Sequence, residues 1–159
     1  MKPENILLES KNSNRIKIID LGLSQIINKE ISLNVERGSI YYLAPEMIKK
    51  KYNHKVDIWS TGVIFYILIT GKPPFNAMVR GKNGNMGLDS KMIKEKILVG
   101  KVDFSDVAFA DVNPGIIEII KMMMTLNPDE RPEAKEILKH PWFRSSVDNN
   151  QRQKGITMF

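Results

Sequence analysis

The chain has 159 residues, no cysteine and a formal net charge of +6. A length of this order fits a single domain, and the lack of cysteine excludes both a disulfide framework and a thiolate metal site. The lysines are spread along the chain and are not interleaved with aromatic residues, as a surface that stacks nucleic-acid bases requires. We therefore expect an intracellular, cytoplasmic protein with a solvated lysine-rich surface and no nucleic-acid partner.

The first predicted elements are two short strands near the N-terminus. Apolar runs at residues 5–8 and 15–19 flank a polar turn cluster at residues 9–14, and this pattern predicts a β-hairpin. No hydrophobic period is sustained over residues 21–42, so a long loop is predicted there. Loops of that length inside a compact domain are usually functional or mobile.

Helices are predicted to dominate the rest of the chain. Proline near a helix start, a capping residue before it, and glycine or proline at its end mark the boundaries. The predicted helices cover residues 45–50, 53–70, 91–99 with Ser90 as cap, 114–124 with Asn113 as cap, and 132–139. The glycine-rich residues 80–87 read as a flexible loop, and the polar residues 144–159 as a disordered tail.

The most apolar segment, residues 61–71, lies in the second of these helices. It is too short to cross a bilayer, which needs about 20 apolar residues. The N-terminus also lacks the basic and then apolar layout of a signal peptide. A helix that is apolar on nearly all sides is instead typical of a protein core. The predicted fold class is mainly α with a small β-hairpin.

Four short motifs follow one another along the chain. They are Lys-Pro-Glu-Asn before the first strand, Asp-Leu-Gly after the second, Ala-Pro-Glu at the end of the long loop, and Asp-Ile-Trp-Ser-Thr-Gly at the start of the buried helix. Their order resembles the C-terminal lobe of a eukaryotic protein kinase. Residues 38–48, 56–75 and 126–143 are similar to the calcium/calmodulin-dependent branch, most of all to calcium-dependent kinases of plants and protists. The resemblance covers residues 1–143 and implies a partial protein-kinase-like C-terminal lobe, in which residues 80–87 look like an insertion.

The resemblance implies a reaction site around the first two motifs. Lys2 would place its charge on the transferred γ-phosphate, and the hydroxyl of Ser39 would bond to that lysine. Asn5 and Asp20 would bind Mg²⁺ and, through it, ATP. Because these two residues flank one hairpin, 15 positions apart, their oxygens are also expected at the same sheet edge. Gly22 would let the loop after Asp20 move.

Three further residues have structural roles by the same resemblance. Glu46 would pair with Arg131, 85 residues further on, in a buried bridge that holds the substrate-binding segment. Asp57 would accept hydrogen bonds from backbone N–H groups of the catalytic loop.

The resemblance also bears on the substrate. A lysine in the position of Lys2 favours Ser/Thr over Tyr substrates.

Several parts of a whole kinase have no counterpart in this sequence. The family's catalytic loop reads His-Arg-Asp-Leu-Lys-Pro-Glu-Asn, so the catalytic aspartate would be the residue immediately before Met1. The glycine-rich loop and the strand lysine of the N-lobe, which hold ATP, are not found either. We therefore expect a Ser/Thr kinase fragment, truncated just after the catalytic aspartate and inactive alone, whose parent needs an N-lobe and acts on a protein substrate. The alternative is a short non-catalytic protein that binds a regulatory protein or another partner with its kinase-like surface.

Overall fold

The computed structural model describes residues 1–22, 24, 40–80 and 85–143. Its elements are η1 (Pro3–Asn5), β1 (Ile6–Leu8), β2 (Ile16–Ile18), η2 (Ile40–Tyr42), α1 (Pro45–Ile48), α2 (Val56–Thr70), β3 (Met78–Arg80), β4 (Met86–Leu88), α3 (Ser90–Val99), η3 (Val107–Phe109), α4 (Pro114–Met123) and α5 (Ala134–Ile137). The predicted mainly helical fold with an N-terminal hairpin is confirmed. Most of the predicted long loop and the whole predicted tail lie outside the described residues.

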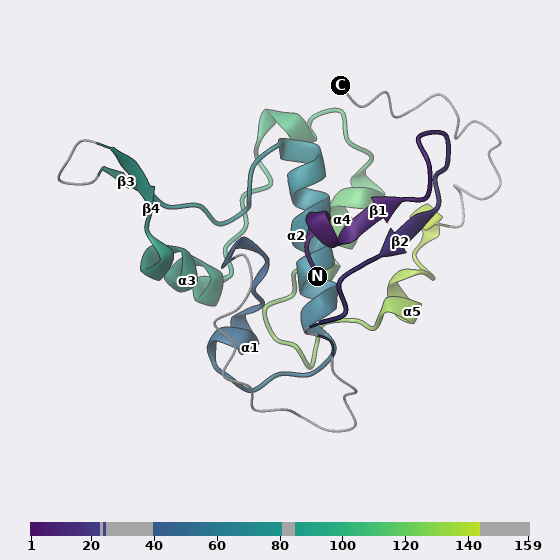
Figure 1. The fold of residues 1–159 in the computed structure, drawn as a ribbon. Helices are drawn as coiled ribbons and strands as arrows, with labels where there is room; N and C mark the ends of the chain where they lie inside the picture. The colour runs from purple at the N-terminus through teal and green to yellow at the C-terminus, as the bar shows by residue number, and fades with distance from the viewer. Residues whose placement is uncertain (23, 25–39, 81–84, 144–159) are drawn as a thin grey trace.

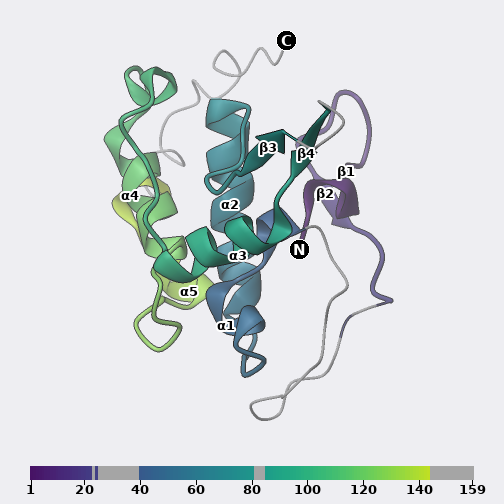
Figure 2. The same cartoon turned by 90° about the vertical axis from the view of Figure 1, so that its left-hand side faces the viewer.

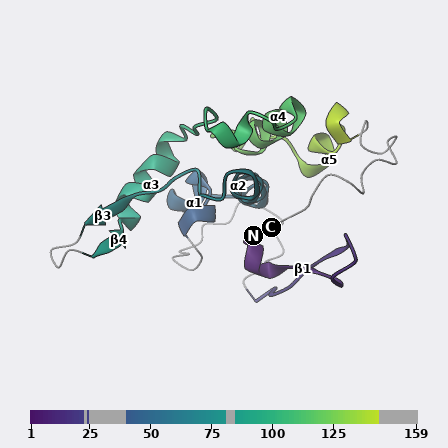
Figure 3. The same ribbon diagram turned by 90° about the horizontal axis from the view of Figure 1, so that it is seen from above.

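The apolar helix α2 lies at the centre of the molecule in two perpendicular views (Figure 1 and Figure 2). Seen from above, α4 and α5 lie on one side of α2 and the hairpin β1–β2 lies on the other (Figure 3). The helix ends at Gly71, whose φ of 69° is left-handed and whose N–H donates to the carbonyl of Ile67. Within the described part of the chain, no helix is both long and apolar enough to cross a membrane.

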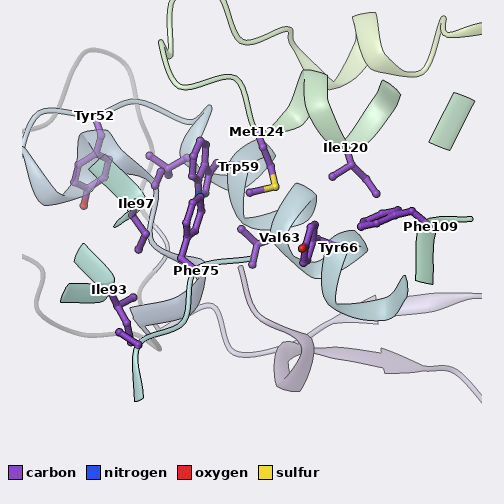
Figure 4. Packing of buried hydrophobic residues seen from close by; sticks show 13 residues of the cluster. Tyr52, Trp59, Val63, Tyr66, Phe75, Ile93, Ile97, Phe109, Ile120 and Met124 are labelled. Atoms are coloured by element: carbon purple, nitrogen blue, oxygen red, sulfur yellow. The ribbon is translucent and has the colours of Figure 1, made fainter. Parts of the chain in front are cut away.

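The main core lies between α2, α3, α4 and the segments that join them. Trp59 and Val63 of α2 are fully buried, and the Trp59 ring stacks on Phe75 with centroids 6.0 Å apart (Figure 4). The buried members of this cluster are Ala44, Tyr52, Val56, Trp59, Val63, Tyr66, Phe75, Ala77, Ile93, Ile97, Phe109, Ile120 and Met124. A smaller cluster joins α4 to α5 through Ile119, Met123 and Ile137. The helical part therefore has a packed interior of its own.

Three helix starts differ from the predicted ones. The helix α2 begins at Val56 and not at residue 53, and the other two differ because another residue supplies the cap. At α3 the carboxylate of Asp89, not the hydroxyl of Ser90, accepts the N–H of Met92 at 2.9 Å. At α5 the N-cap is Glu133, which forms a reciprocal capping box with Glu136. The helix after the proline therefore begins later than predicted, and it is shorter.

A second hairpin overlaps the predicted flexible loop and extends beyond it on both sides. Strands β3 and β4 are antiparallel, with Met78 opposite Leu88 and Arg80 opposite Met86. Each strand has only three residues, too few for an alternating pattern to be counted, which is why the sequence did not predict them. The prediction of a loop was thus wrong for the two strands, while residues 81–84 between them lie outside the described part of the chain.

Candidate functional site

The hairpin β1–β2 brings the two predicted metal ligands to the same place. Ile6 pairs with Ile18 in an antiparallel register, and the next backbone bond runs from the N–H of Ile19 to the carbonyl of Asn5 at 2.9 Å. Asn5 and Asp20 therefore lie at the same end of the hairpin. This arrangement follows from strand pairing, since residues that flank one antiparallel pair meet at its edge.

Asp20 has an unusual backbone conformation. Its φ of 60° lies in the left-handed region, which aspartate tolerates better than most residues other than glycine. Its Oδ1 accepts the N–H of Gly22 at 3.3 Å. A Cβ added at Gly22 would lie 3.2 Å from that same oxygen, so a small residue fits best beside the carboxylate. The left-handed φ thus belongs to Asp20 and not to Gly22, and such conformations concentrate at functional sites.

The chemistry of Asn5 and Asp20 is compatible with Mg²⁺. Carboxylate and amide oxygens are hard ligands, and Mg²⁺ usually takes one or two protein ligands and completes its shell with water and substrate phosphates. No group of three or more histidine or acidic side chains that could bind a metal occurs among the described residues. The two residues therefore fit a shared site that needs phosphate oxygens to be complete.

The first motif is joined to the central helix. Lys2 is extended, with φ −153° and ψ 156°, as a residue before proline prefers. The amino group of Met1 lies 3.1 Å from Oδ1 of Asp57 in the first turn of α2. The carboxylate of Asp57, predicted to accept hydrogen bonds from backbone N–H groups of the catalytic loop, thus contacts the amino group of Met1. Ser39 lies outside the described residues.

Glu46 and Arg131 form a bidentate ion pair. Nη1 of Arg131 donates to Oε1 of Glu46 at 2.6 Å, and Nη2 donates to Oε2 at 3.1 Å. Arg131 is fully buried and Glu46 is 4% exposed. The guanidinium also donates to the carbonyl of Lys55 at 2.9 Å and to that of Thr125 at 3.0 Å. The Arg131 side chain therefore joins α1, the start of α2 and the loop before α5 through its hydrogen bonds.

A second polar contact joins the same segments at the surface. Nε2 of His54 lies 2.9 Å from a carboxylate oxygen of Glu133. This hydrogen bond lowers the pKa of Glu133 below its ordinary value of 4.5. His140 likewise lies 3.3 Å from a carboxylate oxygen of Glu118. No local signal could have shown the first pair, whose members are 79 residues apart.

We expect acid to weaken the fold partly through Glu133. Its pKa is lowered in the folded chain, so its stabilising effect is complete above the unfolded value and is lost as the pH falls through the folded one. Urea unfolding between about pH 6 and about pH 3 should show a smaller loss of stability for Glu133→Gln than for the unchanged chain. Glu95→Gln on α3 is the matched control and should behave like the unchanged chain. This expectation would be contradicted if Glu133→Gln and the unchanged chain lost the same free energy of unfolding over this pH range.

Comparisons with known proteins agree with the arrangement of these motifs. The protein kinase domain family matches residues 1–143. Calcium-dependent protein kinase 33 of Arabidopsis thaliana is 39% identical over 153 residues, which are 96% of this chain and 27% of that protein. Calcium-dependent protein kinase 9 of the same plant is 38% identical over 153 residues, 96% of this chain and 26% of that protein.

A rice relative gives a similar result. Calcium-dependent protein kinase 15 of Oryza sativa subsp. japonica is 36% identical over 159 residues, which are 99% of this chain and 28% of that protein. The chain therefore spans between 26% and 28% of the length of these three relatives.

Proposed function

The chain belongs to the protein kinase family, and from this premise we propose that residues 1–143 are the helical, substrate-binding part of a Ser/Thr kinase. The parent protein would transfer the γ-phosphate of ATP to hydroxyl groups of a protein substrate. The observation that carries the proposal is the meeting of Asn5 and Asp20 at one end of the hairpin, with Asp20 in a left-handed conformation.

Each site residue would have a separate task. Mg²⁺, when bound, would offset negative charge on the phosphates. The carboxylate of Asp20 and the amide oxygen of Asn5 would fix the position of the phosphates, and Gly22 leaves room beside that carboxylate. Lys2 would place a positive charge where negative charge develops during transfer, and the Ser39 hydroxyl would orient it.

The buried pair would position the substrate. Because Glu46 lies in α1 and Arg131 holds it from the loop before α5, α1 cannot shift without breaking two charged hydrogen bonds. The segment around α1 is the one that the resemblance assigns to substrate binding. Asp57 would hold the catalytic loop against α2 through the contact that it makes with Met1.

We propose that the chain alone transfers no phosphate. The substrate hydroxyl must lose its proton to a general base, and the aspartate that does this in the family is not among the 159 residues. The elements that hold ATP from the N-lobe are not among them either. General-base help and correct positioning each contribute orders of magnitude in rate.

The test compares two polypeptides with Mg-ATP and a serine-containing peptide. The chain alone should give no transfer, while a version extended by the residues encoded before Met1, including an N-lobe, should transfer phosphate. In the extended version Asp20→Asn should lower kcat by about 10²-fold or more, and Glu95→Gln should leave it unchanged. Robust transfer by the chain alone, abolished by Asp20→Ala, would overturn the claim of inactivity. Full activity of the extended Asp20→Asn variant would overturn the assigned site.

A non-catalytic role in protein binding is the second candidate. It is favoured by the buried core around Trp59, which is built from residues of this chain alone. The coding sequence upstream of Met1 distinguishes the two candidates. In-frame codons for His-Arg-Asp directly before Met1 would support the kinase, whereas a stop codon there would support the binding protein.

A further inference from the structure

The hairpin β3–β4 has a firm base. Ala77, directly before β3, is 5% exposed, and its carbonyl accepts the N–H of Asp89 at 3.0 Å. Nζ of Lys96 on α3 donates to the carbonyl of Asn76 at 2.6 Å. From this base the hairpin projects away from α2, at the far left in Figure 1 and beyond α3 in Figure 3. It is therefore a protrusion fixed to the core and to α3.

One face of this protrusion is apolar and half exposed. The two cross-strand pairs, Met78 with Leu88 and Arg80 with Met86, lie two residues apart on each strand, so their side chains share a face. Met78 is 49%, Leu88 50% and Met86 58% exposed. Methionine side chains are flexible and adapt well to a binding partner.

The backbone of the hairpin also has open edges. Within the described residues β3 and β4 pair only with each other. A two-stranded sheet is marginally stable by itself, and the outward N–H and C=O groups of an edge strand such as β4 can accept a further strand. A lipid surface would leave such groups without partners in hydrocarbon, so the open edges favour an extended polypeptide over a bilayer.

The charge of the hairpin and of α3 indicates which kind of polypeptide would bind there. The hairpin and α3 carry four basic side chains and two acidic ones within residues 76–80 and 85–100; the basic ones are Arg80, Lys91, Lys94 and Lys96. Asp89 is used as the cap of α3, and Lys96 holds the carbonyl of Asn76, so the cations on which the docking rests are Lys91 and Lys94 of α3. A second copy of this chain would bring the same positive excess to the contact, whereas an acidic segment would be attracted to it.

We propose that the hairpin β3–β4 is a docking site for an acidic, extended segment of another protein. The segment adds to an open edge as a third strand and lays its apolar side chains on Met78, Met86 and Leu88. Its acidic side chains face the lysines of the neighbouring helix α3. The docking site serves a catalytic and a non-catalytic chain alike, so it does not depend on the proposed function.

The test measures binding of a fluorescent peptide of alternating glutamate and valine or leucine residues to the chain, by anisotropy at low salt. We expect saturable binding, about tenfold weaker for the double variant Met78→Ser with Met86→Ser. Val107→Ser is the matched control, since Val107 is 86% exposed but lies in η3, and it should bind like the unchanged chain. The double variant Lys91→Glu with Lys94→Glu should bind more weakly and lose the dependence on salt. Far-UV circular dichroism checks that all variants keep their helices.

Four results would overturn the proposal. The first is equal binding of a peptide with lysine in place of glutamate, and the second is no binding of the acidic peptide. The third is stronger binding to phosphatidylserine vesicles than to the peptide, with the same loss in the methionine double variant, which would assign the hairpin to a membrane surface. The fourth is a dimer in sedimentation that only the methionine double variant abolishes, which would assign the hairpin to a second copy of the chain.

Discussion

Arg131→Met is expected to destabilise the fold by about 3–5 kcal/mol, the usual loss when one partner of a buried ion pair is removed. The methionine keeps much of the apolar volume beside Trp59, whose ring centroid lies 5.1 Å from the guanidinium carbon. It leaves the Glu46 carboxylate buried without its two charged donors. It also leaves the carbonyls of Lys55 and Thr125 without their side-chain donor.

A double-mutant cycle separates the ion pair from the packing around it. Glu46→Leu should also cost several kcal/mol, because it leaves a buried guanidinium with only carbonyl partners. The combination of Glu46→Leu with Arg131→Met should cost less than the two single changes together, since neither charge then remains unpaired. Unfolding by urea of the version extended by the N-lobe, followed by far-UV circular dichroism, gives the four stabilities.

The matched control is an exposed ion pair of the same chemistry. Glu9 lies 3.6 Å from Arg15 and 3.5 Å from Lys17 on the surface of the first hairpin. Glu9→Gln should cost less than about 1 kcal/mol, as exposed pairs usually do. The free energy of unfolding of Arg131→Met could instead lie within about 1 kcal/mol of that of the unchanged chain. In that case the attraction within the buried pair would only offset the cost of desolvating its two charges.

The sequence predicted those features that depend on residues close together in the chain. A polar cluster between two apolar runs was enough for the first hairpin, and its pairing was enough to bring Asn5 and Asp20 to one edge. The proline after Asn113 marked the start of α4, where the Asn113 side chain accepts the N–H of Gly115 at 2.9 Å. The pair of Glu46 and Arg131, 85 residues apart, was implied by the family resemblance and not by any local pattern.

Features set by tertiary packing were not predicted. The contact of His54 with Glu133 depends on how α5 lies against the start of α2. The left-handed φ of Asp20 depends on the path of the chain after β2, and aspartate is common in many other conformations. At α3 the predicted cap was Ser90, but the backbone at the neighbouring Asp89 has the extended conformation that a cap needs.

The isolated chain is expected to self-associate or to pack only loosely. On the first hairpin, three side chains on one face are more than half exposed: Leu8 at 56%, Ile16 at 59% and Ile18 at 53%. Leu68 of α2 is 66% exposed. Apolar area left in water forgoes about 25 cal/mol per Å². A few hundred Å² of such surface would therefore forgo several kcal/mol, which is comparable with the whole stability of a typical domain.

Spectroscopy distinguishes a loosely packed chain from a fixed one. Far-UV circular dichroism should show the helices, while the near-UV bands of Trp59 and Trp142 should be weak and a dye for apolar surface should bind. Replacing Ile16 and Ile18 by threonine should reduce both self-association and dye binding. Val99→Thr on α3 is the control, because Val99 is 70% exposed but lies on a different element from that apolar face.

The apolar face of the first hairpin is larger than a single exposed side chain, and this difference is the reason for the expected results. A single exposed side chain such as Val99 is ordinary on a protein surface, whereas neighbouring exposed side chains on one face act together as a site of association. The threonine changes should therefore have a much larger effect on the hairpin than on α3. A soluble monomer with a sharp cooperative melt and strong tryptophan bands would contradict the prediction. That result would mean that the core around Trp59 stabilises the fold without any cover for the hairpin, and it would favour the non-catalytic binding protein over the kinase fragment.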